Sequence, residues 1–168
     1  MSHAIHSVAL STAPGTAGLG SRFGRSFASA GDLNGDGYDD AVVGVPNDAM
    51  NPGYRVFLGP LVTSSGFPTA QPAAVAVMGQ GSIVAPVGDM NGDGYPDVMI
   101  GSTVPAEIPV SFIHGGTSDP TFSPAYPPRP RGSNAEYGAS IAGVGDFNGD
   151  GYPDAVVGNT GVMSGVPA

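Results

Sequence analysis

The strongest constraint on the fold is a decapeptide that occurs three times at constant spacing. It reads GDLNGDGYDD at 31–40, GDMNGDGYPD at 88–97 and GDFNGDGYPD at 145–154, so equivalent residues lie 57 positions apart. The apolar segment that follows is also repeated, as DAVVGVP, DVMIGST and DAVVGNT. Self-similarity at a fixed period of this size indicates a repeat architecture, in which each unit packs against its neighbours.

Short strands are predicted in every repeat. The chain has 28 Gly and 17 Pro among 168 residues and no Lys, so strong formers of surface helices are scarce. Runs rich in Val, Ile, Ala and Phe are bounded by Gly and Asp, which is typical of strands joined by tight turns. Strands are predicted before each decapeptide at about 25–30, 82–87 and 139–144, after it at 40–45, 97–102 and 154–159, and farther on at 54–59, 73–79 and 110–115. Four short strands per repeat favour an all-β fold of antiparallel β-propeller blades, three per chain.

The 168 residues are interpreted as a single half-propeller domain. Its repeats are placed at approximately 23–79, 80–136 and 137–168, and residues 1–22 are expected to form an N-terminal closing strand and linker. Propellers typically have about four to eight blades, so three blades leave an open arc with exposed apolar faces. A homodimer would close a six-bladed ring. The alternative is that the chain is a fragment of a larger propeller.

These features resemble the FG-GAP repeats of integrin α-chain N-terminal β-propellers and their bacterial relatives. The resemblance rests on Phe23-Gly24 and Tyr137-Gly138, on the D-x-N-x-D-G-x-x-D loop, and on the VVG segment after it. The second repeat departs from the pattern, with Gln80-Gly81 in place of the aromatic-Gly pair. The resemblance implies adhesion or recognition at an extracellular or cell-surface location. No signal peptide is visible in the chain.

The decapeptide has the chemistry of a calcium loop. In the first copy Asp32, Asn34 and Asp36 offer side-chain oxygens at positions 1, 3 and 5, the Tyr38 carbonyl can bind at position 7, and Asp40 at position 9 can close the cage with both oxygens. Calcium takes six to eight oxygen ligands in a flexible geometry, which suits this donor set. The predicted ligands for three Ca²⁺ ions per chain are Asp32, Asn34, Asp36, Tyr38, Asp40, Asp89, Asn91, Asp93, Tyr95, Asp97, Asp146, Asn148, Asp150, Tyr152 and Asp154.

Other interpretations of the loop were weighed. An EF-hand needs an acidic ligand at position 12 and flanking helices, whereas position 12 is Val43, Ile100 or Val157 and the flanks are strand-like. The all-oxygen donor set disfavours zinc and copper, while magnesium stays an alternative. An ion-free Asn/Asp/Gly turn would leave the clustered carboxylates repelling one another. A structural role for the ion is favoured over a catalytic one, because the loop supplies its own ligands.

The charge distribution excludes one class of partner and favours others. The formal net charge is −9, which equals the nine aspartates at positions 1, 5 and 9 of the three loops, because the other five acids match the five Arg. No basic stripe exists to bind nucleic acid, and no apolar run is long enough to span a membrane. No catalytic residue or organic cofactor is predicted, so the chain is interpreted as a binding module for a protein or glycan rather than an enzyme. Two alternatives stay open: a scaffold without a ligand, natural or engineered, and a propeller-based carbohydrate-active enzyme.

Overall fold

The computed structural model describes residues 20–47, 53–60, 80–102, 110–117, 121–123 and 137–159, which form β-sheets without a helix. The first sheet contains β1 (Phe27–Gly31), β2 (Asp40–Val45) and β3 (Gly53–Phe57). The second contains β4 (Gln80–Gly88), β5 (Asp97–Ser102), β6 (Val110–His114) and β7 (Thr121–Ser123), and the third contains β8 (Tyr137–Gly145) and β9 (Asp154–Asn159).

Strand pairing is antiparallel throughout the described residues, and neighbours in sequence are neighbours in each sheet. The strands predicted after each decapeptide are confirmed to the residue as β2, β5 and β9. Their boundaries are sharp because an acidic loop ends directly before an apolar run. The strand predicted at 73–79 lies outside the described residues, and the fourth strand of the second sheet is β7, a three-residue segment that was not predicted.

A register shift occurs at the same place in every repeat, just before the loop. It lies between Ser29 and Gly31 in β1, and the equivalent shifts in β4 and β8 end at Gly88 and Gly145. These three glycines have φ values of 70°, 79° and 69°. A bulge whose extra residue is a glycine in the left-handed region strengthens the local twist. The glycine of the Gly-Asp pair that opens each decapeptide therefore allows the bulge in the backbone, whatever the role of the aspartate after it.

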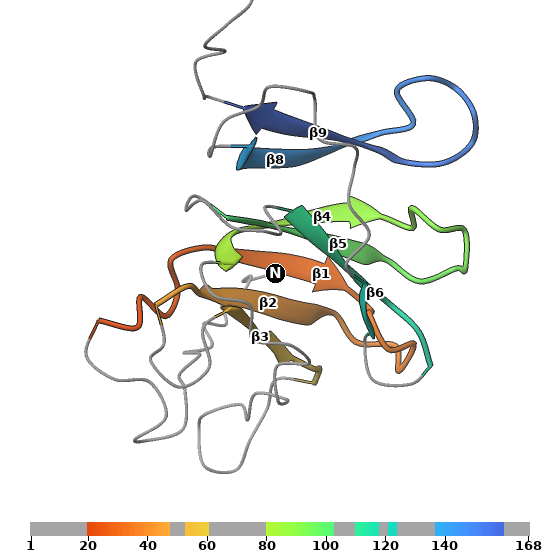
Figure 1. The fold of residues 1–168 in the computed structure, drawn as a ribbon. Coiled ribbons are helices and arrows are strands. Elements are labelled where there is room, and N and C mark those ends of the chain that lie inside the picture. Colours follow the sequence, from red (N-terminus) through yellow and green to blue (C-terminus); the bar gives the residue numbers. More distant parts are fainter. Residues whose placement is uncertain are drawn as a thin grey trace, which may run out of the picture.

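The three sheets stack on one another, and the core lies between consecutive sheets (Figure 1). One cluster joins the first and second sheets through residues such as Leu33, Tyr54 and Ile100. A second cluster joins the second and third sheets through residues such as Met99 and Tyr137. Every residue of β5 is buried, since this strand has a sheet on both sides. Fully burying one large aliphatic side chain contributes about 1.5–3 kcal/mol, so these junctions hold the repeats together.

The first strands of the three repeats lie side by side. β1 contacts β4, and β4 contacts β8. Together they line an open hollow of about 490 Å³, to which each repeat contributes the same three positions: Phe27, Ala28 and Ser29; Val84, Ala85 and Pro86; Ile141, Ala142 and Gly143. This arrangement is expected for the inner strands of neighbouring propeller blades. Among the described residues, no helix is long and apolar enough to cross a membrane.

Candidate metal centre

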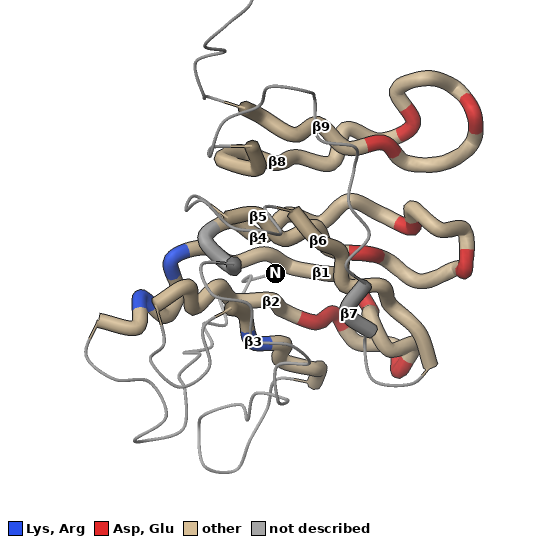
Figure 2. The backbone as a smooth tube through the Cα atoms, in the orientation of Figure 1, with Lys and Arg blue, Asp and Glu red and all other residues tan. Residues whose placement is uncertain are grey.

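The three decapeptide loops lie on one side of the stack of sheets. They connect β1 to β2, β4 to β5 and β8 to β9, and Figure 2 shows their acidic residues in red along that side. The loops follow one another because the sheets that carry them are stacked. The negative charge recognised in the sequence is therefore gathered on a single edge of the molecule.

The aspartate at position 1 organises each loop by accepting backbone hydrogen bonds. Oδ1 of Asp32 accepts from the N–H groups of Gly35 (2.7 Å) and Asp36 (2.9 Å), and Oδ2 accepts from the N–H of Gly37 (2.8 Å). Asp89 and Asp146 make the same three bonds in their own loops. Gly37 has φ 89°, a left-handed conformation that favours glycine. The loop is thus wrapped around its first carboxylate.

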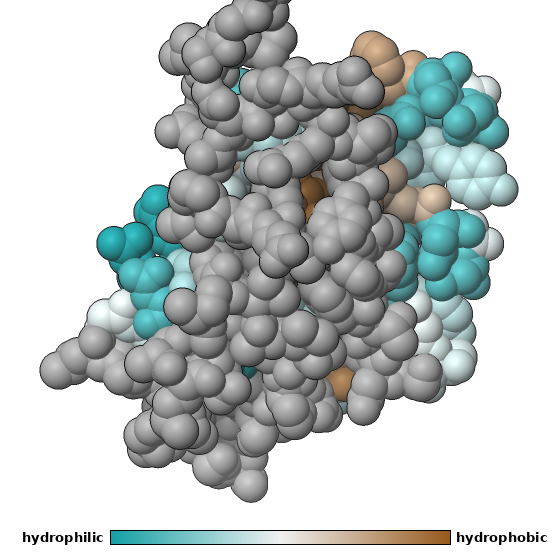
Figure 3. Space-filling view, viewed as in Figure 1, coloured by the Kyte–Doolittle hydropathy of each residue, from teal (hydrophilic) through white to brown (hydrophobic). Residues whose placement is uncertain are grey.

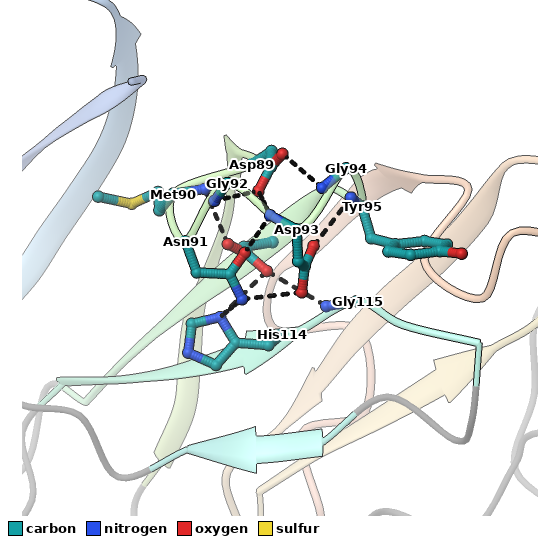
Figure 4. Close-up of polar contacts among 10 residues, drawn as sticks. Asp89, Met90, Asn91, Gly92, Asp93, Gly94, Tyr95, His114 and Gly115 are labelled. Carbon is teal, nitrogen blue, oxygen red and sulfur yellow. Dashed lines mark hydrogen bonds and ion pairs between the residues drawn. The ribbon is translucent and has the colours of Figure 1, made fainter. Parts of the chain in front are cut away.

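The residues at positions 3 and 5 are hydrogen-bonded to each other, as Figure 4 shows for the second loop. Asn91 Nδ2 donates to Oδ2 of Asp93 (2.9 Å), the N–H of Asp93 donates to Oδ1 of Asn91 (3.0 Å), and the N–H of Tyr95 donates to Oδ1 of Asp93 (2.9 Å). The bond from Tyr95 and then the bond from Asn91 hold the pKa of Asp93 below its usual value. The pKa of Asp150 in the third loop is lowered by the equivalent bonds.

The aspartate at position 9 is fixed differently, by amides from two parts of its repeat. Oδ2 of Asp40 accepts from the N–H of Leu33 (2.8 Å), and Oδ1 accepts from the N–H of Gly59 (2.7 Å). Asp40 is buried, and this burial raises its pKa although both hydrogen bonds act in the opposite direction. In the third loop both bonds to Asp154 reach the same oxygen, Oδ2. The predicted closure of a cation cage by both oxygens of this residue stays a prediction.

One neighbour of the second loop was missed by the sequence analysis. Nδ1 of His114, at the end of β6, lies 3.1 Å from Oδ1 of Asp97 and 3.4 Å from Nδ2 of Asn91. The ring also stacks on Phe112 at a centroid distance of 5.7 Å. His114 had been assigned only to a strand, because the strand pairing that brings β6 beside the loop is not local in sequence.

The donor set of each loop fits a hard cation in its chemistry. All the side-chain donors are carboxylate or amide oxygens, and an ionised carboxylate has about four lone-pair sites, so the hydrogen bonds described leave capacity for a metal. The side chains are not, however, gathered around one point. Within the described residues no group of three or more His, Cys, Asp or Glu side chains is close enough to hold a metal ion. Coordination therefore requires the carboxylates at positions 1, 5 and 9 to turn toward a common centre.

The tyrosine at position 7 connects neighbouring loops. A Cβ atom placed on Gly35 would lie 2.7 Å from Cε1 of Tyr95, and one placed on Gly92 would lie 2.8 Å from Cε1 of Tyr152. The ring of each following repeat thus rests on a glycine of the preceding loop, where no other residue fits without displacement. These two tyrosine rings are therefore part of the packing between neighbouring repeats.

Comparison with known proteins agrees with the fold and the loops. Residues 23–57 match the FG-GAP repeat, and residues 89–157 match the FG-GAP-like repeat. These matches show that the chain contains FG-GAP repeats. The resemblance inferred from the sequence is thereby confirmed, and the antiparallel sheets are those expected of FG-GAP propeller blades.

Several curated relatives are integrin α chains. The chain is 33% identical to integrin alpha-6 of Gallus gallus over 149 residues, covering 84% of this chain and 14% of the relative. It is 34% identical to integrin alpha-IIb of Mus musculus over 162 residues, covering 85% and 15%. It is 30% identical to integrin alpha-4 of Xenopus laevis over 154 residues, covering 83% and 14%. The chain thus spans about a seventh of the length of these relatives.

Proposed function

We propose that this FG-GAP chain is a calcium-binding propeller module that recognises a protein partner in an extracellular setting. The observation that carries the proposal is the threefold repetition of one loop geometry, in which Asp, Asn and Asp at positions 1, 3 and 5 keep the same hydrogen bonds. The nine aspartates at positions 1, 5 and 9 of the three loops bring like charges together on one edge. Divalent cations bound there would reduce the repulsion between the carboxylates, and this would explain why the acidic loop is repeated.

The role proposed for the ion is structural. Each loop joins two paired strands, and in the first two repeats the position-9 aspartate also accepts a hydrogen bond from an N–H just after the third strand, that of Gly59 or of Gly115. An ion bound by positions 1, 5 and 9 would therefore fix the loop to the sheet. Calcium is favoured over magnesium because a cage with several carboxylates and a main-chain carbonyl suits its larger, flexible coordination sphere.

Recognition of a protein, rather than catalysis, is supported by the relatives. Those described above are named as integrin α chains, and none of these three is named as an enzyme. The extracellular setting follows from the same resemblance. A glycan ligand stays a prediction of the sequence analysis, without an observation in the described residues that favours it over a protein.

The test is a calcium titration of chelator-treated protein by calorimetry, combined with thermal unfolding. Three bound ions per chain are expected. Calcium at 100 times its Kd should stabilise the folded state by about 2.7 kcal/mol per site. For a domain of this size 1 kcal/mol corresponds to about 2–4 °C in Tm, so each occupied site should raise Tm by about 5–11 °C. Magnesium at the same concentration should give a smaller rise.

The matched control is Asp150→Asn, which keeps an acceptor oxygen for the N–H of Tyr152 but removes the charge. This variant should lose one of the three bound calcium ions and keep its fold. No heat of binding, together with an unchanged Tm after calcium addition, would refute the calcium assignment. Binding of a protein partner is tested separately, by comparing how much of a candidate partner the protein captures with and without chelator.

A further inference from the structure

The second loop has a neighbour that the first loop lacks. His114 ends β6 and lies beside Asp97, whereas its counterpart in the first repeat is Leu58. The two are equivalent because each precedes the glycine whose N–H donates to the position-9 aspartate. Leu58 is apolar and packs against the first core cluster, while the ring of His114 is directed at the second loop (Figure 4). One side-chain position therefore carries a hydrogen-bonding group in one repeat and none in the other.

The ring of His114 has a fixed orientation. It stacks on the buried ring of Phe112 with an interplanar angle of 9°, because side chains two residues apart lie on the same face of a strand. Its Nδ1 lies 3.1 Å from Oδ1 of Asp97 and 3.4 Å from Nδ2 of Asn91. Two acceptors would repel one another at 3.1 Å, so Nδ1 carries a hydrogen and donates it to Asp97. The neutral ring with its hydrogen on Nδ1 and the protonated ring both make this bond.

In the first loop the position-9 carboxylate keeps a lone pair on each oxygen. A carboxylate has about four lone-pair sites, two on each oxygen. Oδ2 of Asp40 accepts one hydrogen bond, from the N–H of Leu33, and Oδ1 accepts one, from the N–H of Gly59. Both oxygens of Asp40 can therefore bind the same cation.

In the second loop only one oxygen of this carboxylate keeps a lone pair. Oδ2 of Asp97 accepts one hydrogen bond, from the N–H of Met90 (2.8 Å). Oδ1 accepts two, from the N–H of Gly115 (3.2 Å) and from Nδ1 of His114 (3.1 Å). With both sites of Oδ1 in use, Asp97 can bind a cation through Oδ2 alone while His114 stays in place.

We propose that His114 lowers the selectivity of the second loop for calcium over magnesium, because it leaves Asp97 a single oxygen for the cation. Calcium takes six to eight oxygens and accepts both oxygens of a carboxylate, whereas magnesium takes six in octahedral geometry and keeps several waters. Losing one carboxylate oxygen therefore weakens calcium binding more than magnesium binding. The loops lie on the hydrophilic side of the molecule, teal in Figure 3, so water can take the place of that oxygen. This inference rests on the proposed binding of cations by the loops.

The first experiment compares two loops one at a time. Asp36→Asn combined with Asp150→Asn leaves the second loop as the calcium site, and Asp93→Asn combined with Asp150→Asn leaves the first, since each change removes the charge at position 5. Both single-loop proteins are titrated with calcium and with magnesium by calorimetry. The second loop should bind calcium about tenfold more weakly than the first, the effect of displacing one hydrogen bond to a charged group. Magnesium should bind to the two loops with about equal affinity.

The decisive variant is His114→Leu, which gives the second loop the residue that the first repeat has at this position. The side chain of His114 is 22% exposed, so the variant should fold, which thermal unfolding checks. In the protein with only the second loop it should tighten calcium binding about tenfold and change magnesium binding by no more than about twofold. Leu58→His is the reciprocal change and should weaken calcium binding by the first loop. Calcium binding that is unchanged or weaker after His114→Leu would overturn the proposal.

The second experiment counts the waters on the bound cation. Europium(III) serves as a calcium probe, and its luminescence lifetimes in H₂O and D₂O give the number of coordinated waters. The second loop should hold about one water more than the first, and His114→Leu should remove it, which a merely structural role of the ring would not do. If neither single-loop protein binds calcium, the calcium assignment itself is refuted. Equal calcium affinity and equal hydration of the two loops would overturn only the role of His114.

Discussion

Replacing Gly35 with alanine measures how much the ring of Tyr95 contributes to the junction between the first two repeats. Gly35 has φ 77°, and a Cβ atom there would lie 2.7 Å from Cε1 of Tyr95. Gly37 offers a matched control in the same loop, because it has φ 89° and open space around its Cβ position. Both glycines donate their N–H to Asp32, so the two substitutions differ mainly in the contact with the next repeat.

The expected losses follow from two separate costs. An alanine held in the left-handed region costs about 1–2 kcal/mol, which applies to both Gly35→Ala and Gly37→Ala. Forcing an extra methyl group into a packed contact costs about 1–3 kcal/mol, and this applies to Gly35→Ala alone. Because the ring of Tyr95 can shift toward solvent, we expect the lower part of that range. Gly35→Ala should therefore lower the free energy of unfolding by about 1–2 kcal/mol more than Gly37→Ala.

The measurement is urea or thermal unfolding of both variants, in calcium and in chelator. A difference of 1–2 kcal/mol corresponds to about 2–8 °C in Tm for a domain of this size. Adding Tyr95→Ala to each variant completes a double-mutant cycle, in which the extra loss from Gly35→Ala should disappear. If the two glycine variants lose the same stability with Tyr95 present, the ring moves aside without cost, and it does not hold the repeats together.

Three further predictions concern the loops and the core. Asp40→Asn should lower the free energy of unfolding, measured by calorimetry, by about 1–3 kcal/mol, because the new amide N–H₂ would face one of two buried N–H donors. Asp154→Asn should lower it by less, since both bonds described for Asp154 reach one oxygen. Leu33→Ala should cost about 2–5 kcal/mol in the same assay, because Leu33 is fully buried between the first two sheets; a loss below 1 kcal/mol would contradict its place in the core. The folded pKa values of Asp93 and Asp150 lie below the usual aspartate value of 3.8, so in metal-free protein they contribute stability above that pH and lose it as the pH falls through their folded values. The raised pKa of Asp40 has the opposite effect on how stability changes with pH. When Asp93 and Asp150 are both replaced by Asn, Tm should fall less steeply between about pH 5 and 3 than it does in the wild-type protein.

The repeat, the loops and the paired strands could be predicted because their causes are local. The Gly-Asp pair that opens each loop places a bulge glycine before the position-1 aspartate, and the apolar run that follows is rich in β-branched residues, which favours a strand. β2, β5 and β9 were therefore found to the residue. β3 and β6 were found to within two residues at either end.

Contacts between distant segments could not be predicted in the same way. His114 reaches Asp97 only because β6 pairs with β5, and the register of that pairing is set by the whole sheet. The amide of Gly59 reaches Asp40 for a similar reason. The sequence indicated that the position-9 aspartate closes the loop. It gave no sign that this aspartate is buried and shared between the loop and the third strand.

Burial depends on the neighbouring repeat rather than on the residue itself. Val87 and Val144 are the same residue at the same repeat position, yet Val87 is buried and Val144 is exposed, because within the described residues a following sheet covers the second repeat and none covers the third. In repeat proteins stability is approximately a sum of terms for each repeat and for each junction. The second repeat has two junctions, and the third has one in the isolated chain. The β8–β9 hairpin is therefore the element whose stability depends most on what covers its open face.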